Sequence, residues 1–289
     1  MTNATLPGGT FELADDLVVS RFGYGAMQLA GPNVMGPPAD RDQAVRVLRE
    51  AIDMGITHID TSDAYGPEVT NGLIRSALHP YPDSLHIVTK VGAERDARGG
   101  WPPARSPQQI RDAVHSNLDH LGLDVLDVVN LRAGGPISPE QYPIQESFAT
   151  LVGLQEQGLI RHLGVSNVTP EQLAEARSIA PIVCVQNFYN VANRGDDALI
   201  DSLAADGIAY VPFFPLGGFS PLQSDVLSEV AARHDTSPLS VALAWLLQRS
   251  SNILLIPGTS SPDHLRENAV GASLELSDAD VAELDTIVT

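Results

Sequence analysis

The chain has 289 residues, 43% of them apolar, and a formal net charge of −19 at pH 7. The negative charge is spread along the chain and disfavours nucleic acid and anionic membranes as partners, because both attract basic surfaces. No window holds the ~20 uninterrupted apolar residues of a membrane span, and the first residues do not resemble a secretion signal. We therefore expect a cytoplasmic protein. Its single cysteine, Cys184, lies in an apolar run and is expected to be a core thiol.

The first predicted element is a β-hairpin over residues 10–20, where two apolar runs flank a pair of aspartates. We expect it to precede the main fold and to plug its floor. From residue 40 onward, amphipathic stretches alternate with short apolar runs of strand type, separated by Gly, Pro or Asp. Strands are predicted near 21–25, 56–60, 85–90, 125–131, 160–165, 182–187, 208–213 and 252–256.

Helices are predicted between these strands, for example over 40–54, 106–121 and 169–178. Ser106 before Pro107 and Thr169 before Pro170 are typical of helix starts. The segment 221–249 is long enough for two helices, divided near 235–238.

Strands and helices that alternate in this way, with no linker or change in composition, predict a single α/β domain over residues 1–289. The predicted architecture is a closed (β/α)8 TIM barrel with an N-terminal β-hairpin. The alternative is a doubly wound open sheet. Against it, the segment 23–28 has only two of the three glycines of a dinucleotide-binding G-x-G-x-x-G, and no helical run follows.

Lys90 is the only lysine, against sixteen arginines, and it stands at the C-terminal end of a predicted strand. An arginine stays charged at any accessible pH, whereas a lysine can take part in proton transfer or change the pKa of a neighbour. In a barrel of this kind the C-terminal strand ends meet in one mouth. Polar or aromatic residues also stand at the other strand ends, namely Asp60, Tyr65, Asn130, Arg132, Ser166, Asn167, Gln186, Asn187, Phe213 and Phe214. Each could cap a turn or a helix, but together they predict a site.

These residues resemble the aldo-keto reductase family. The matching segments are 60–66, 89–90, 164–167, 186–190, 256–260 and 267–268, in the family's order. The resemblance implies reversible hydride transfer between a nicotinamide cofactor, usually NADPH, and an aldehyde or ketone.

Carbonyl reduction needs a hydride on carbon and a proton on oxygen, and an unperturbed phenol, with a pKa near ~10, is a poor proton donor at neutral pH. Tyr65 is the predicted catalytic proton donor, Lys90 the ammonium beside it, and Asp60 the carboxylate that keeps Lys90 charged. Arg132 stands where most of the family has a histidine. Strand alternation puts residues 128, 130 and 132 on one face, so an inward Arg132 would bind an anionic substrate oxygen. Otherwise it leaves the barrel for a surface carboxylate.

The resemblance also implies the cofactor contacts. They are Met27, Asp60, Ser166, Asn167, Gln186, Phe213, Phe214, Pro215, Leu216, Gly218, Gly258, Thr259, Ser260, His264 and Asn268. Ser166, Asn167 and Gln186 match positions that bind the nicotinamide carboxamide, and Phe213 matches a residue that stacks on its ring. Residue 258 is glycine where many NADPH-specific members have lysine, so NADPH is expected from the family and NADH stays open.

The implied substrate-binding residues are Met27, Tyr65, Trp101 and Arg132, with Phe219 as a second aromatic cover. Within the family, the runs 23–29, 126–132 and 211–218 look most like bacterial pyridoxal reductases. Pyridoxal carries a phenolate next to its aldehyde, which suits an arginine at position 132.

Three other interpretations stay open. The substrate can be another aldehyde or ketone, Lys90 can form a Schiff base as in barrel aldolases, or the chain can bind the nucleotide and regulate a partner without turnover. A metal role for His58, Asp60 and Asp63 lacks a recognisable ligand set, so no metal is expected. We expect a small-molecule partner and a monomer or weak homo-oligomer.

Overall fold

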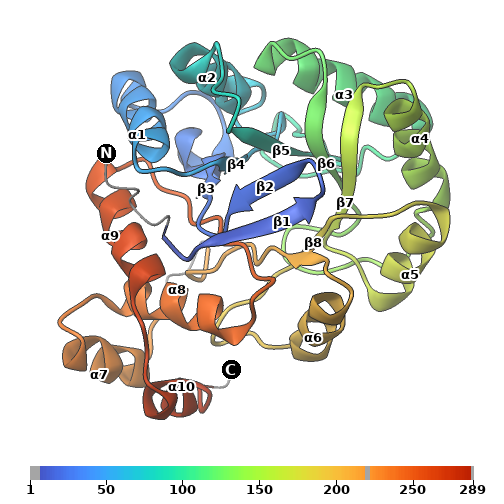
Figure 1. Ribbon diagram of the computed structural model, residues 1–289. Coiled ribbons are helices and arrows are strands. Elements are labelled where there is room, and N and C mark those ends of the chain that lie inside the picture. Colours follow the sequence, from blue (N-terminus) through green and yellow to red (C-terminus); the bar gives the residue numbers. More distant parts are fainter. Residues whose placement is uncertain (1–6, 219–221, 288–289) are drawn as a thin grey trace.

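The computed structural model describes residues 7–218 and 222–287, and in these a ring of helices surrounds a curled parallel sheet (Figure 1). Seven strands pair in chain order, each with the next. They are β3 (Tyr24–Gly25), β4 (His58–Asp60), β5 (His86–Val91), β6 (Leu126–Arg132), β7 (Ile160–Ser166), β8 (Cys184–Gln186) and β9 (Ala209–Tyr210).

The segment 252–258 closes the sheet, through isolated parallel bridges rather than as the regular eighth strand that the sequence predicts. The Leu254 amide donates to the Tyr210 carbonyl at 2.9 Å, and the Leu255 amide donates to the Arg21 carbonyl at 2.7 Å. The segment thus joins the last strand to the chain that leads into the first. The predicted (β/α)8 barrel is confirmed in the described residues.

Two glycines make this closure possible. Gly25 and Gly258 form one of the parallel bridges. A Cβ on Gly25 would lie 2.3 Å from the Ile256 carbonyl oxygen, and a Cβ on Gly258 would lie 2.7 Å from the Gly25 carbonyl oxygen. Both distances are shorter than real Cβ contacts. A side chain at position 258 would therefore require this backbone to shift.

Ten α-helices and two short 3-10 helices lie between and outside the strands in the described part of the chain. Ser106 and Thr169 accept hydrogen bonds from the third residue of their helices, each followed by proline, as predicted. The predicted division of 221–249 yields α7 and α8. The helices are α1 (Arg41–Asp53), α2 (Val69–Leu78), α3 (Pro107–Leu121), α4 (Gln145–Glu156), α5 (Pro170–Ile179), α6 (Asp197–Ala205), α7 (Asp225–Arg233), α8 (Pro238–Arg249), α9 (Pro262–Ser273), α10 (Asp278–Leu284), η1 (Ala26–Leu29) and η2 (Pro32–Val34).

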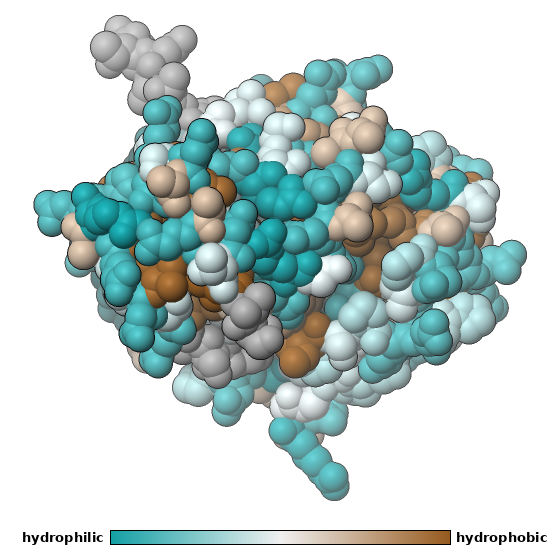
Figure 2. Space-filling model, turned by 90° about the horizontal axis from the view of Figure 1, so that it is seen from below, coloured by the Kyte–Doolittle hydropathy of each residue, from teal (hydrophilic) through white to brown (hydrophobic). Residues whose placement is uncertain are grey.

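The outer surface of these helices is polar. Seen from below in Figure 2, the molecule is mostly hydrophilic, with apolar side chains in small separate groups. Among the described residues, no helix combines the length and apolar character needed to cross a membrane.

The hairpin of β1 (Thr10–Ala14) and β2 (Leu17–Ser20) lies across one end of the barrel (Figure 1). Its buried side chains Leu13, Leu17 and Val19 pack in one cluster with Val88 and Val128, which point into the barrel. The predicted floor plug is therefore confirmed. The cavity described next lies at the other end, where the strands finish.

Candidate active site

A cavity with about 980 Å³ of space between its lining atoms, part of it open to solvent, lies at the C-terminal strand ends. The predicted catalytic residues line it, as do the predicted cofactor-binding residues apart from Thr259, Ser260, His264 and Asn268. Of the other polar residues predicted at the strand ends, Asn130 and Asn187 do not line it. It also has lining residues that the sequence did not single out, among them Gln28 and Pro136.

Asp60 and Lys90 form a buried ion pair at the cavity floor. They come from the adjacent strands β4 and β5. Lys90 Nζ donates to Asp60 Oδ1 at 2.5 Å and to the Thr61 carbonyl at 3.1 Å. Gln186 Nε2 donates to the other Asp60 oxygen, Oδ2, at 2.9 Å. The Lys90 and Asp60 side chains are only 8% and 4% exposed, so loss of either would leave an uncompensated buried charge.

This environment keeps Lys90 protonated. Burial lowers the pKa of Lys90, but the negative charge of Asp60 and contacts with Tyr65 outweigh burial, and the net pKa is raised. A Schiff-base lysine needs a neutral amine at neutral pH. The electrostatics therefore favour a permanent ammonium over a nucleophile.

Tyr65 lies beside this ammonium on the loop between β4 and α2. Its side chain is 8% exposed, and Lys90 Nζ is 5.4 Å from the centre of its ring. The Trp101 ring meets the Tyr65 ring edge-on, with 6.2 Å between their centroids. The phenol thus reaches the cavity between an ammonium and an indole.

Arg132 points into the barrel mouth, as strand alternation predicts, and the expected alternative of a surface ion pair does not hold. Its Nη2 donates to the Gly135 carbonyl at 2.8 Å, and its guanidinium carbon is 5.0 Å from the Trp101 ring centroid. Burial lowers the pKa of Arg132, but a guanidinium stays charged near neutral pH. The site therefore has a cation where a substrate oxyanion can bind.

Arg95 is a further cation that sequence reasoning missed. Its guanidinium carbon lies 3.9 Å from the centre of the Trp101 ring. It also donates to the Asn33 carbonyl at 2.7 Å, which ties the loop of Trp101 to the η2 segment. The loop between β5 and α3 is irregular, so no periodic pattern in the sequence pointed to this contact.

Two buried side-chain oxygens at the cavity lack a hydrogen-bond donor. Gln186 Oε1 and Asn167 Oδ1 have no hydrogen-bond partner, although both residues are at most 1% exposed and line the cavity. The amide nitrogens of both residues already donate hydrogen bonds. Asn167 Nδ2 donates to the Gly135 carbonyl at 2.6 Å, and Gln186 Nε2 donates to Asp60. A carboxamide group offers the N–H donors that these oxygens lack. The residues present therefore fit a nicotinamide.

Phe213 is the residue that the sequence predicts to stack on the nicotinamide ring. Phe213 lines the cavity, the Phe188 ring is stacked on it at 5.8 Å between centroids, and the Phe214 ring meets it edge-on at 5.4 Å. Phe214 has a φ of +54°, and Gly218 packs against its ring. Phe219 lies outside the described residues.

The expected contacts to the far end of the nucleotide lie around the start of α9, away from the cavity lining. Ser261 caps α9 by accepting from the His264 amide. Thr259 and Asn268 are buried, and Ser260 and His264 are exposed. A helix N-terminus with free amides is a suitable place for phosphate.

His58 and Cys184 are core residues. A Cβ on Gly23 would lie 2.3 Å from the His58 ring, and burial lowers the pKa of His58. Cys184 Sγ donates to Asn130 Oδ1 at 3.2 Å, and burial raises its thiol pKa to about 12. Among the described residues, no group of three or more His, Cys, Asp or Glu side chains could hold a metal ion.

Comparison with known proteins gives a consistent result. Residues 21–289 match the model of the aldo/keto reductase family. Pyridoxine 4-dehydrogenase from Escherichia coli is 62% identical over 271 residues, which cover 93% of this chain and 95% of that enzyme.

Solved structures agree with the barrel. A thermostable aldo-keto reductase in complex with the inhibitor epalrestat is 30% identical, with a TM-score of 0.82, over 96% of this chain and 99% of that one. An aldo-keto reductase from Klebsiella pneumoniae in complex with NADPH is 25% identical, with a TM-score of 0.79, over 96% of this chain and 93% of that one.

Proposed function

The chain belongs to the aldo/keto reductase family, and we propose that it reduces pyridoxal to pyridoxine with NADPH in the cavity at the strand ends. The observation that carries this proposal is the buried Asp60–Lys90 pair beside Tyr65, with Arg132 pointing into the same space. The name of the Escherichia coli relative supports the substrate. The NADPH complex of the Klebsiella relative supports the cofactor.

Tyr65 delivers the proton. NADPH, when bound, would supply a hydride to the carbonyl carbon, and the phenol O–H would give its proton to the carbonyl oxygen. The Lys90 ammonium stabilises the phenolate that Tyr65 becomes. Asp60 keeps that ammonium charged and in place, with Gln186 holding its second oxygen.

The same residues orient the cofactor. Gln186 Oε1 and Asn167 Oδ1 would accept from the carboxamide N–H groups, and Phe213 would support one face of the ring. Met27 and Gly258 line the cavity beside them. Because backbone closure keeps residue 258 a glycine, phosphate selection falls to groups near α9 such as His264 and Ser260.

Arg132 binds the substrate phenolate. A guanidinium donates charge-assisted hydrogen bonds to an oxyanion and cannot lose its proton, so it orients the neighbouring aldehyde without competing with Tyr65. Trp101, which contacts both Arg132 and Tyr65, offers its ring to the flat pyridine.

Further parts of the proposal concern the whole chain. It acts as one domain over residues 1–289, in the cytoplasm, as a monomer or weak homo-oligomer, on a small carbonyl compound. The size-exclusion elution volume of the active protein tests the oligomeric state.

The testing experiment follows the absorbance of the reduced nicotinamide with purified protein, NADPH or NADH, and pyridoxal or the neutral 4-nitrobenzaldehyde. Rapid loss with NADPH and pyridoxal, and slow loss with the neutral aldehyde, is the expected result. Loss with the neutral aldehyde alone would keep the chemistry and refute the substrate. Nucleotide binding without loss on either aldehyde would instead support a regulatory protein.

A further inference from the structure

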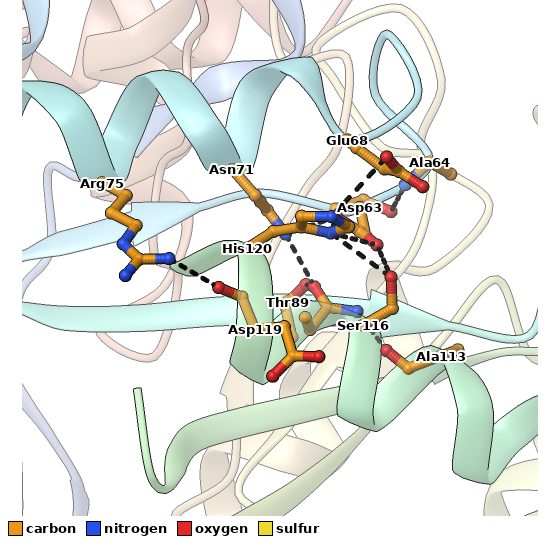
Figure 3. A network of polar contacts seen from close by, with 12 residues as sticks. Asp63, Ala64, Glu68, Asn71, Arg75, Thr89, Ala113, Ser116, Asp119 and His120 are labelled. Atoms are coloured by element: carbon orange, nitrogen blue, oxygen red, sulfur yellow. Dashed lines mark hydrogen bonds and ion pairs between the residues drawn. The ribbon is translucent and has the colours of Figure 1, made fainter. Parts of the chain in front are cut away.

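A polar network lies between the sheet and helices α2 and α3 (Figure 3). Its centre is Asp63, two residues before Tyr65 on the same loop. The Asp63 carboxylate accepts from Asn71 Nδ2 at 3.1 Å, from the Ser116 hydroxyl, and from His120 Nδ1 at 3.0 Å. Two helices thereby hold the loop that carries the proposed proton donor.

The Ser116, His120 and Asp63 side chains do not form a nucleophilic triad. A triad histidine binds the carboxylate with one ring nitrogen and the serine with the other. In this network Nδ1 of His120 faces both groups, and Nε2 lies 3.5 Å from Glu68. The Ser116 hydroxyl donates to the carboxylate. The cluster is therefore suited to holding a loop, not to attacking a substrate.

Two asparagines extend the network to the strands. Asn71 Oδ1 accepts from the Thr61 hydroxyl at 2.8 Å, and Asn71 Nδ2 donates to Asn117 Oδ1 at 2.9 Å. Asn117 Oδ1 also accepts from the Thr89 hydroxyl at 2.6 Å, and its Nδ2 donates to the Ala113 carbonyl at 2.8 Å. One chain of hydrogen bonds thus connects the loop of Tyr65, the end of β4 and the strand β5.

The contacts on the strands are adjacent to the catalytic pair. Thr61 follows Asp60 and offers its carbonyl to Lys90 Nζ. Thr89 precedes Lys90 on β5. Successive side chains of a strand point to opposite faces. The network therefore binds Thr61 and Thr89 on the helix side, while their neighbours Asp60 and Lys90 face the cavity.

The burial of this network favours a single set of hydrogen bonds. Thr61, Asn71, Thr89 and Asn117 are all 0% exposed. In such a dry site an unpaired polar group is costly, and each amide donates on one side and accepts on the other. A shift of either strand or loop would break several of these bonds together.

We propose that Asn71 and Asn117 are positioning residues, which through Thr61 and Thr89 hold Tyr65 in register with the Asp60–Lys90 pair. This inference rests on the proposed function, because it assigns the network to proton delivery by Tyr65. It adds residues that touch neither substrate nor cofactor.

The test uses threonines, because replacing a buried asparagine could unfold the chain. Thr61→Val with Thr89→Val removes both hydroxyl donors and keeps the branched shape. Thr70→Val is the matched control, because the Thr70 hydroxyl is equally buried on α2 and has no hydrogen-bond partner. Two single variants are compared at position 89: Thr89→Val removes the hydroxyl, and Thr89→Ser keeps it.

Two readouts are compared across these variants. The first is the single-turnover rate of NADPH oxidation by pyridoxal, with the NADPH Kd measured separately. The second is the NMR signal of protein labelled at lysine Cε, which reports Lys90 alone because the chain has one lysine. The double variant is expected to lose about tenfold or more in rate with Kd within about twofold, and to shift the Lys90 signal. Thr70→Val should match the wild type, and Thr89→Ser should be closer to it than Thr89→Val.

A wild-type rate and an unshifted Lys90 signal in the double variant, with only a lower unfolding temperature, would overturn the inference. A wild-type protein that does not oxidise NADPH with pyridoxal would refute the proposed function instead. In that event the Lys90 signal alone decides whether the network positions the pair.

Discussion

Replacement of Asp60 by asparagine tests the buried ion pair directly. Asparagine keeps the shape but has one acceptor oxygen, where Lys90 Nζ and Gln186 Nε2 both donate to Asp60. Lys90 is then left as an uncompensated ammonium that is 8% exposed. Breaking one partner of a buried pair costs about 3–5 kcal/mol. With an unfolding entropy of about 2.1 cal/mol/K per residue, a chain of this length has about 0.6 kcal/mol/K, so the expected loss in Tm is about 5–8 °C.

The assay is thermal unfolding at pH 7 followed by circular dichroism. Asp60→Asn combined with Lys90→Met should recover part of the loss, because no charge is then left unpaired. The pH dependence has a defined sign. The pKa of Lys90 is raised, so the pair's stabilisation is complete below the pKa of an unfolded lysine and is lost as pH rises through the folded value. An Asp60→Asn variant that unfolds at the wild-type temperature would refute the pair.

The remaining predictions concern three other positions. Arg132→His should raise KM for pyridoxal more than for 4-nitrobenzaldehyde; steady-state kinetics with equal losses on both would show that Arg132 does not read substrate charge. Gly258→Lys should lower Tm without tightening NADPH binding, because its Cβ would lie 2.7 Å from the Gly25 carbonyl oxygen; fluorescence titration showing tighter binding would contradict this. Cys184, buried and with a thiol pKa near 12, should react with a thiol reagent at pH 8 only after unfolding; fast reaction of the native protein would disprove it.

The sequence predicted the elements whose signals are local. Ser106 and Thr169 each precede a proline, and their side-chain oxygens accept from a free backbone N–H in the first helical turn. This start signal needs no contact with the rest of the fold. The eighth strand was less regular than predicted. Its residues pair with both neighbours, yet the close approach of Gly25 and Gly258 depends on the barrel closing, which no local pattern encodes.

The site also contains some residues that the sequence predicted and others that it did not. Lys90, Tyr65 and Asp60 stand at strand ends or in a recognisable segment, so their place in the cavity could be predicted from the chain. Arg95 and the amides Asn71 and Asn117 could not. Asn71 and Asn117 sit on helices as ordinary polar residues, and only the packing of α2 and α3 against the sheet joins them. Only the tertiary structure therefore reveals that these two asparagines belong to the network.

The most direct test of the central claim compares wild type with Tyr65→Phe. NADPH-saturated protein is mixed with pyridoxal, the nicotinamide absorbance is followed through one turnover, and the NADPH Kd is measured beside it. Phenylalanine keeps the ring that contacts Trp101 but cannot donate a proton. The expected result is an unchanged Kd with the fast absorbance loss abolished. A Tyr65→Phe variant that turns over at the wild-type rate would contradict Tyr65 as the proton donor.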